Sequence, residues 1–352
     1  MSKEQEAIEA TIREQTGNES SASGTAENTP YAMIETQHEL ERLSVVGEGA
    51  YGKVYQVQNK SNKEIYAMKV ITIKPEEKHF LENEILILKT SKSPFICKMY
   101  QCFESVEKVY LVLEFIPGGD LHSYFDKVEV VKENHAKFFL AEILLALEYL
   151  HNNHIIYRDL KPENIMFDRR GHIKLTDFGL CKLNMYEGAK TKTICGTLEF
   201  MAPEVIKGHP YGFSVDIWSF GVLMYEMLTG EKPFSGTTDA ELEKAIVSGK
   251  VTLPKILSRV AKELIKRLLT RATGNRFSIA EVKESTFFSG IDWQKMLLQE
   301  IEPPIRPCIL NDRDVSNFDE EFTTQMVTHS GGKSDTEETM INSFENFDIQ
   351  LS

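Results

Sequence analysis

A glycine-rich stretch, GEGAYGKV at residues 47–54, sets the first limit on the fold because of the residues that come next. The spacing of Gly47, Gly49 and Gly52 also occurs in dinucleotide-binding folds, where a helix must come after the glycines. Here the next residues, KVYQVQNKSNKEIYAMKV, predict a strand, a turn and a second strand. We therefore expect the glycines in a β-hairpin whose backbone N–H groups can approach a phosphate. A plain glycine-rich turn is the alternative on this stretch alone.

The hydrophobic pattern changes character along the chain. From residue 40 to 116, β-branched and aromatic runs between turn sequences predict an antiparallel sheet, interrupted by one helix in EKHFLENEILILKT. After PGGD at 117–120, apolar residues recur every three or four positions, as in HAKFFLAEILLALEYLH, which is typical of helices. DIWSFGVLMYEMLTG is apolar nearly all round and predicts a central buried helix. We expect an α+β fold with a small β-rich lobe and a larger helical lobe.

Composition separates the two ends from the middle. The polar residues 1–38 predict a mobile extension, and we place the lobes at 39–116 and 117–288 and a tail at 289–352. The first 30 residues carry six acidic and two basic side chains, and residues 311–352 carry ten and two, so the middle is nearly neutral although the whole chain has a formal charge of −13. Partners such as nucleic acid, or stable association with a membrane, would need clustered basic residues, and we expect neither.

Cysteine usage and the absence of targeting patterns bear on the compartment. The five cysteines form no CxxC pair, and we find neither a signal-peptide pattern nor a long uncharged apolar segment. We expect an unsecreted monomer in the cytoplasm, or also in the nucleus.

Two charged residues of the small lobe form a predicted pair. Strand alternation in IYAMKV places Lys69 on one face with Ala67 and Ile65, on the side expected to be buried, where its ammonium needs a partner. Glu84, in the predicted helix, would supply that partner. A solvated lysine and a solvated glutamate are the alternative on this evidence.

Oxygen-bearing side chains gather in the next motifs. Asp159 and Asn164 lie in YRDLKPEN, a loop stiffened by Pro162, and Asp177 of DFG comes after the strand-like HIKLT. Three such side chains returning to one place suit a hard cation such as Mg²⁺. Residues 202–204 then read APE.

The ordered set GxGxxGxV, AMK, RDLKPEN, DFG and APE resembles the eukaryotic protein kinases, over residues 40–288. The resemblance implies a bilobal protein kinase fold and transfer of the γ-phosphoryl group of ATP, with Mg²⁺, to Ser or Thr hydroxyls of proteins. It implies that Asp159 accepts the hydroxyl proton and that Lys161, typical of the serine/threonine class, offsets charge on the phosphoryl group. Asp216 resembles the family's structural anchor for the catalytic loop.

The same resemblance implies a set of nucleotide and metal contacts. Lys69, held by Glu84, would bind the α/β-phosphates, Asn164 and Asp177 would hold the metal, and Phe178 would sense the active state. Leu113 resembles the gatekeeper, and the backbone of Glu114 and Ile116 would bond adenine. The implied ATP-binding residues are Val46, Gly47, Glu48, Gly49, Ala50, Tyr51, Gly52, Lys53, Val54, Ala67, Lys69, Leu113, Glu114, Ile116 and Phe318.

Later segments resemble the AGC group of serine/threonine kinases, in wording most similar to the ribosomal-protein kinase, Akt and glucocorticoid-induced kinase branch. KTKTICGTLEFMAPEV resembles an AGC activation segment, which implies phosphorylation of Thr193 by an upstream kinase and a phosphate site at Arg158 and Lys182. IDWQKMLLQEIEPPIRP and SNFDEEF, the latter with Phe318, resemble the start of a C-terminal tail that wraps back on the small lobe.

The end of the tail resembles the regulatory motifs of that group. Ser330 falls at the turn-motif position, and Phe344 and Phe347 form a hydrophobic motif expected to dock beside the helix of Glu84. Asp348 stands where many relatives have a phosphorylated Ser or Thr. A carboxylate carries less charge than a phosphate, so we expect docking that is constitutive but weaker.

Carboxylates in the large lobe bear on substrate choice. Asp120, Glu163 and Glu226 match positions that read arginines upstream of the phosphorylated residue, which implies protein substrates with basic residues there. Plain surface or helix-pairing charge is the alternative for these three. A pseudokinase scaffold that binds nucleotide without turnover is the alternative to the enzyme as a whole. A small-molecule phosphotransferase is disfavoured by the activation segment and APE.

Overall fold

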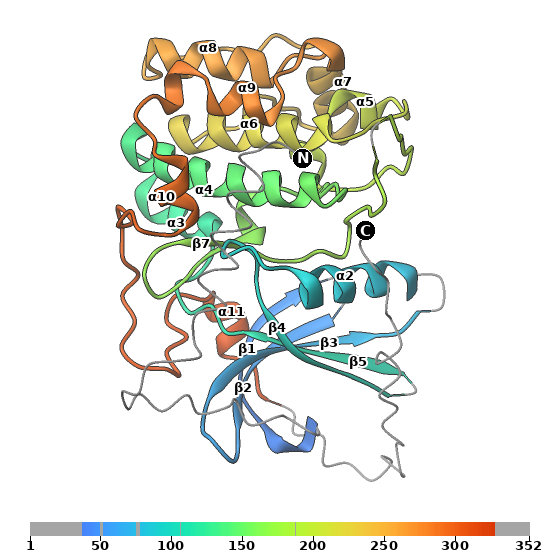
Figure 1. Cartoon of the computed structure of the whole chain (residues 1–352), viewed down its shortest axis with the longest axis vertical. Helices are drawn as coiled ribbons and strands as arrows, with labels where there is room; N and C mark the ends of the chain where they lie inside the picture. Colours follow the sequence, from blue (N-terminus) through green and yellow to red (C-terminus); the bar gives the residue numbers. More distant parts are fainter. Residues whose placement is uncertain (1–36, 50–51, 75–77, 106, 187, 328–352) are drawn as a thin grey trace, which may run out of the picture. The chain divides into compact units, whose positions relative to one another are not determined.

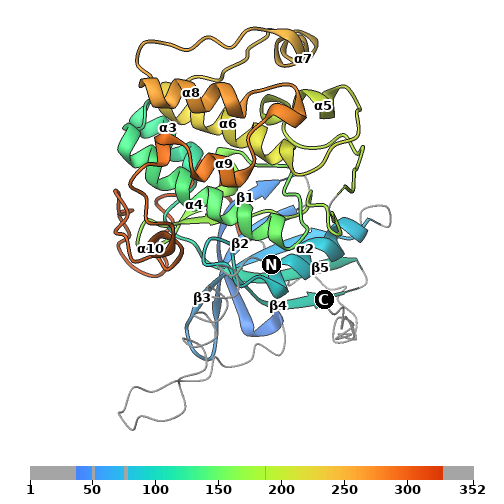
Figure 2. The same ribbon diagram turned by 45° about the horizontal axis from the view of Figure 1, so that its top comes forward.

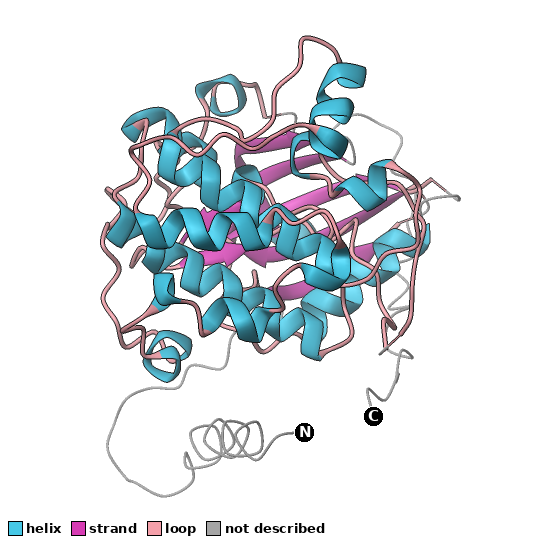
Figure 3. Ribbon diagram, turned by 90° about the horizontal axis from the view of Figure 1, so that it is seen from above, coloured by secondary structure: helices cyan, strands magenta, loops and turns pink. Residues whose placement is uncertain are grey.

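The computed structural model describes residues 37–327, apart from 50–51, 75–77, 106 and 187. Within this range a sheet and a group of helices form two lobes (Figure 1). Seen from the side of the large lobe, the strands lie behind the helices (Figure 3). The predicted α+β class and the order of the two lobes are confirmed.

The small lobe is a five-stranded antiparallel sheet in the order β1-β2-β3-β5-β4. The strands are β1 (Leu40–Gly49), β2 (Gly52–Asn59), β3 (Ile65–Thr72), β4 (Met99–Glu104) and β5 (Lys108–Glu114). β1 and β2 form the predicted hairpin, with Gly49 opposite Gly52. Gly52 has a φ of 147°, and a Cβ there would lie 1.8 Å from the carbonyl oxygen of Val70. Only glycine fits at this position.

Helix α2 (Lys78–Thr90) packs on the sheet through Ile85, Ile87 and Leu88, as its periodicity predicts. The sequence predicted that Lys69 lies on the buried face of β3, and the structure corrects this expectation. Tyr66 and Met68 are more deeply buried than Ala67 and Lys69, so the lysine lies on the half-buried face. The reason is that this face borders the region between the lobes instead of a closed core.

The large lobe is built around two long helices that the sequence predicted. Its helices are α3 (Leu121–Val128), α4 (Glu133–Asn152), α5 (Pro203–Ile206), α6 (Ser214–Thr229), α7 (Asp239–Ser248), α8 (Arg259–Leu268), α9 (Ile279–Lys283) and α10 (Trp293–Leu297). From Val215 to Leu228, every residue of α6 except Glu226 is buried. A Cβ on Gly221 would lie 2.7 Å from Cβ of Leu268 on α8. α7 lies at the end of this lobe remote from the sheet (Figure 2). Among the helices that the structure describes, none is long and apolar enough to cross a membrane.

A short hairpin, β6 (Ile165–Phe167) and β7 (Ile173–Leu175), supports the loop with the RDLKPEN motif and leads into DFG. The first and last residues of each strand are buried in the hydrophobic core. The two motifs therefore lie at the two ends of one hairpin, as the sequence HIKLT between them suggests.

The described part of the tail returns to the small lobe, as expected (Figure 1). Helix α11 (Glu320–Thr323) contacts β1, and the Asn317 side chain donates a 3.1 Å hydrogen bond to the Pro117 carbonyl. Gly119 has a φ of 78°, and a Cβ there would lie 2.5 Å from the Asn317 carbonyl oxygen. Glycine at this position therefore lets the tail approach the connection between the lobes.

A buried ion pair fastens the APE motif to the end of the large lobe. Arg276 donates to both carboxylate oxygens of Glu204, at 2.7 and 2.9 Å, and also to the carbonyl of Ser214 at 2.7 Å. Both side chains are at most 7% exposed. Removing one partner of such a pair leaves the other charge buried without compensation.

We therefore expect Glu204→Gln to lower the free energy of unfolding by about 3 kcal/mol. The exposed Arg259–Glu263 pair on α8 offers a matched control, and Glu263→Gln should cost less than about 1 kcal/mol. Chemical denaturation of both variants measures the difference. Equal losses would show that the Glu204 pair contributes no more than a surface pair.

Candidate active site

One ammonium joins three separate segments of the chain. Lys69 Nζ on β3 lies 2.7 Å from Glu84 Oε1 on α2 and 3.1 Å from Asp177 Oδ1 of DFG. The first contact is the pair predicted from the sequence. The second links the small lobe to a residue just beyond β7 of the large lobe.

The charges of this trio shift one another's pKa values. Burial acts to lower the pKa of Lys69, but the carboxylates of Glu84 and Asp177 outweigh it and raise that pKa, so the lysine stays charged. Burial also acts to raise the pKa of Asp177, but Lys69 and the Gly179 N–H outweigh it and hold that pKa low. For Glu84 burial dominates and raises the pKa, although Lys69 opposes it. Of the two carboxylates, Asp177 therefore has the stronger preference for its ionised form.

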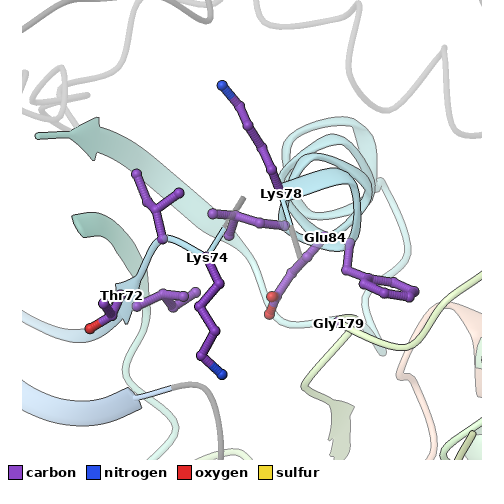
Figure 4. Close-up of a pocket in the computed structure, with 9 residues that line it drawn as sticks. Thr72, Lys74, Lys78, Glu84 and Gly179 are labelled. Carbon is purple, nitrogen blue, oxygen red and sulfur yellow. The ribbon is translucent and has the colours of Figure 1, made fainter. Parts of the chain in front are cut away.

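A small cavity of about 30 Å³ lies beside this trio, between the end of β3, α2 and Gly179. In Figure 4 the Glu84 carboxylate points from α2 toward the segment that holds Gly179, whereas the Lys78 ammonium points away from it. A Cβ on Gly179 would lie 3.6 Å from Glu84 Oε2, which is ordinary contact distance. The DFG segment thus packs directly against the α2 carboxylate.

Asp159 lies at the centre of a second polar cluster. Its Oδ2 lies 3.0 Å from Lys161 Nζ and 3.0 Å from Asn164 Nδ2. Its Oδ1 accepts from the backbone N–H of Thr197 at 3.1 Å and from the Thr197 hydroxyl at 2.9 Å. Thr197 also accepts from Lys161 at 3.0 Å. Thr197 was not anticipated from the sequence, where its only signal was its place two residues after Cys195, in CGT.

The backbone of the catalytic loop is held by Asp216 on α6. Its carboxylate accepts from the N–H of Tyr157 at 3.0 Å and of Arg158 at 2.8 Å, and lies 2.7 Å from His151 Nε2. Arg158 has a φ of 72°, a conformation that costs energy for a residue with a side chain. Asp216, which is fully buried, offsets that cost, in agreement with the anchoring position expected for it.

The activation segment must come close to this loop for Thr197 to contact Asp159. Gly196 has a φ of 103°, and a Cβ there would lie 2.7 Å from the Arg158 carbonyl oxygen. Glycine at this position therefore permits the approach.

The residues expected to hold the metal are suitably arranged for a cation with few protein ligands. The amide nitrogen of Asn164 donates to the Asp159 backbone carbonyl and side chain, which leaves its amide oxygen as an acceptor. Asp177, whose pKa is low, is 38% exposed. One amide oxygen and one ionised carboxylate fit Mg²⁺, which takes its remaining ligands from water and phosphate. In the described part of the chain, no three His, Cys, Asp or Glu side chains converge on a metal site of another kind.

The expected nucleotide-binding residues line one side of the small lobe. Pairing across the sheet places Gly47 opposite Val54, Val54 opposite Lys69 and Ala67 opposite Leu113. Val46 precedes this row on β1, Glu114 is the last residue of β5, and Ile116 lies in the connection to the large lobe. Ala50 and Tyr51 lie outside the described residues.

The tail contacts both ends of this row. Phe318 stacks on Phe115, in the connection between the lobes, with ring centroids 5.6 Å apart. Near the glycines, the Gln325 side chain accepts from Lys53 Nζ at 3.0 Å and donates to Glu48 at 3.4 Å, and Lys53 and Glu48 pair at 3.1 Å. The tail therefore contacts the β1–β2 hairpin near its tip as well as the connection between the lobes.

The residues expected to act in regulation are placed in part. Thr193 and Lys182 are exposed, and Arg158 reaches the Thr193 segment through Tyr211. The Arg158 guanidinium donates to the Tyr211 hydroxyl at 3.3 Å, and that hydroxyl donates to the Thr193 carbonyl at 2.5 Å. Ser330, Phe344, Phe347 and Asp348 lie outside the described residues.

The three carboxylates expected to read a substrate have different surroundings. Asp120 caps α3 by accepting from the backbone N–H and the hydroxyl of Ser123, at 2.7 and 3.1 Å. Asp120 therefore has a structural role at the start of α3. Glu163 is exposed beside the catalytic loop, and Glu226 on α6 pairs with Lys232 at 3.2 Å. Burial raises the pKa of Glu226, and the nearby Glu163 adds to that effect.

Comparison with known proteins agrees with this geometry. Residues 40–288 match the family model of the protein kinase domain, and residues 309–348 match that of the protein kinase C terminal domain. The chain is 43% identical over 312 residues to "Ribosomal protein S6 kinase beta" of Caenorhabditis elegans, which covers 85% of this chain and 56% of that protein.

Two further relatives extend the comparison. "Serine/threonine-protein kinase gad8" of Schizosaccharomyces pombe is 42% identical, over 88% of this chain and 56% of that protein. "Ribosomal protein S6 kinase alpha-3" of Homo sapiens is 43% identical, over 84% of this chain and 41% of that protein. The chain spans about half the length of the curated relatives it matches. The chain has a protein kinase domain followed by this C-terminal domain, and it is similar to these relatives over most of its length. The chain therefore belongs to the protein kinase family, in its AGC serine/threonine group.

Proposed function

We propose that this protein transfers the γ-phosphoryl group of ATP to Ser or Thr hydroxyls of protein substrates. The observation that carries the proposal is the shared position of the Lys69 ammonium, between Glu84 and Asp177. That contact brings a phosphate-binding cation, its helix partner and a metal-binding carboxylate together in the arrangement that active kinases require.

The catalytic loop supplies the acceptor side of the reaction. Asp159 is oriented by four donors from three residues, and it would accept the proton of the substrate hydroxyl. Lys161 lies 3.0 Å from that carboxylate, where its charge would offset the negative charge that develops on the transferred group. Thr197 positions both side chains and connects them to the activation segment.

The other side of the site would hold the nucleotide and metal. Asn164 and Asp177 would bind Mg²⁺, which neutralises phosphate charge when bound. The β1–β2 hairpin would cover the phosphates, Lys69 would contact them, and the connection at Glu114 and Ile116 would bond adenine. Phe318, stacked beside this connection, would contribute to the adenine side.

We further propose how the enzyme is controlled and where it acts. An upstream kinase would phosphorylate Thr193, and Arg158 and Lys182 would bind the phosphate. Glu163 and Glu226 would favour substrates with basic residues upstream of the acceptor. We propose a monomer that acts in the cytoplasm, also in the nucleus, on protein substrates only.

The proposed reaction predicts distinct effects for two aspartates. Asp159→Asn should abolish transfer to a protein or peptide, yet leave Mg-ATP affinity within about threefold, because the residue contacts the acceptor. Asp177→Ala should abolish transfer and also weaken Mg-ATP binding. Radiolabel transfer and nucleotide titration of both variants measure these effects. Turnover by Asp159→Asn at the wild-type rate would contradict the role of Asp159, whereas absence of turnover in the wild type would contradict the proposed function and favour a scaffold.

Phosphorylation of Thr193 should raise activity roughly tenfold or more, because the added charge forms new bonds with Arg158 and Lys182. Thr193→Ala should abolish this activation, whereas Thr191→Ala, in the same segment, should retain it. Peptide phosphorylation before and after treatment with an activating kinase measures the effect. Full activation of Thr193→Ala would contradict the assignment.

The C-terminal motif matches the kinase C-terminal domain model, which supports a regulatory role for Phe344, Phe347 and Asp348. Phe347→Ala should lower the activity several-fold, because burial of the ring on the small lobe would be lost. Asp348→Ala should cost less, since a carboxylate that binds at the protein surface would contribute little. Steady-state peptide assays rank the two variants. An unchanged rate for Phe347→Ala would remove the docking role.

A further inference from the structure

Tyr211 joins the activation segment to the large lobe at two points. Its backbone pairs with that of Thr191, with one N–H to carbonyl hydrogen bond in each direction, at 2.9 and 3.0 Å. Its hydroxyl donates to the Thr193 carbonyl at 2.5 Å. The side chain is almost fully buried and belongs to the hydrophobic core, so the packing of the ring fixes the position of this hydroxyl.

The same hydroxyl contacts the catalytic loop. The Arg158 guanidinium donates to it at 3.3 Å. Other N–H groups of this guanidinium donate to the carbonyls of Leu180, at 2.5 Å, and Cys181, at 3.3 Å, which come shortly after DFG. Arg158 therefore contacts the beginning of the activation segment directly and its middle through Tyr211.

The chemistry of the hydroxyl sets the direction of this bridge. A tyrosine hydroxyl has one proton to donate and can also accept a hydrogen bond. Because the Arg158 guanidinium can only donate and the Thr193 carbonyl can only accept, the hydroxyl proton is directed at Thr193. The bridge uses the backbone of Thr193 and leaves its exposed side chain accessible to an upstream kinase. Every group in the bridge belongs to the unmodified chain.

Both ends of the bridge lie close in sequence to residues of the catalytic loop cluster. Arg158 is adjacent to Asp159, and Thr193 comes shortly before Thr197, which bonds the Asp159 carboxylate. The contacts through Tyr211 and through Thr197 thus fasten one short stretch of the activation segment to the loop at two places. Loss of the first contact would loosen the second.

We propose that Tyr211 is a positioning residue that holds the activation segment on the catalytic loop before Thr193 is phosphorylated, and so gives the unphosphorylated enzyme a basal activity. This inference rests on the proposed function, because it assumes that Asp159 acts in phosphoryl transfer and that Thr193 is the phosphorylation site. It assigns to a hydroxyl group the task that phosphorylation would later reinforce.

Phosphorylation would add a second and stronger attachment of the same segment. A phosphate on Thr193 would form charge-assisted bonds with Arg158 and Lys182, whereas the Tyr211 hydroxyl bonds a neutral carbonyl. Once the phosphate holds the segment in place in nearly all molecules, loss of the weaker bond changes that fraction little. Without the phosphate, the same loss lowers the fraction of correctly placed segments in full. The effect of the hydroxyl should therefore depend on the phosphorylation state.

The test compares wild type and Tyr211→Phe, each treated with a phosphatase or with an activating kinase and checked by intact mass. The Phe ring retains the core packing and removes only the hydroxyl. In the dephosphorylated form, Tyr211→Phe should lower kcat for a peptide roughly fivefold to tenfold, the effect of one lost hydrogen bond. KM for Mg-ATP should stay within about twofold, because the nucleotide contacts are unchanged. In the phosphorylated form, kcat of the two proteins should differ less than about twofold.

Tyr149 offers a matched control, because its hydroxyl also bonds one backbone group, the N–H of Lys92 at 2.9 Å, away from the activation segment. Tyr149→Phe should change kcat by the same factor in both phosphorylation states. Thr193→Ala retains the backbone carbonyl and should therefore retain the basal activity. Addition of Tyr211→Phe to Thr193→Ala should lower that activity by the same roughly fivefold to tenfold factor.

Hydrogen–deuterium exchange reports the contact without turnover. In dephosphorylated Tyr211→Phe, the amide groups of residues 190–197 should exchange faster than in wild type, and phosphorylation of Thr193 should restore slow exchange. The amide groups of α8 should exchange at the wild-type rate in both forms.

Two results would overturn the role of Tyr211 and leave the proposed function intact. One is an equal loss of kcat in Tyr211→Phe in both phosphorylation states, and the other is a wild type that is active only when phosphorylated. A wild type that phosphorylates no peptide in either state would instead contradict the proposed function. The exchange rates of Tyr211→Phe would still decide the role of Tyr211 in that case.

Discussion

The site depends on a single lysine ammonium shared between two carboxylates. Lys69 belongs to a strand, Glu84 to a helix and Asp177 to the large lobe, so the contacts at 2.7 and 3.1 Å fix three elements relative to one another. In such a buried place an unpaired charge is costly, because little water solvates it. The same arrangement that stabilises the charges therefore also defines which position of α2 is compatible with a complete site.

In the large lobe, a second buried carboxylate holds separate segments of the chain together. Asp216, on the apolar helix α6, holds the catalytic loop through two backbone N–H groups, one of them at a residue with positive φ. Thr197 then couples that loop to the activation segment. Chemistry-bearing residues thus lie on loops, while packed helices supply the rigid support that orients them.

Local hydrophobic patterns were sufficient to predict the two lobes, because the strands around the glycines alternate, α4 has the 3.6-residue period of one helix face and α6 is apolar nearly all round. Ordered motifs also anticipated the contact between Lys69 and Glu84. Thr197 and the Glu226–Lys232 pair were missed, since they depend on turns at Gly196 and Gly230 that no periodicity reveals. Likewise the cap that Asp120 forms on α3 was not predicted, although an Asp directly before a helix is a preferred N-cap residue.

Hydrogen–deuterium exchange on Lys69→Met tests most directly whether the shared ammonium holds the three elements together. The amide groups of α2 and of the segment immediately after Asp177 should exchange faster in the variant than in wild type, whereas those of α8 should be unchanged. That result would show that the lysine organises the position of the helix, in addition to the phosphate contact proposed for it. Unchanged exchange in α2 would contradict the central role of the lysine, because the helix would then be held by apolar packing alone.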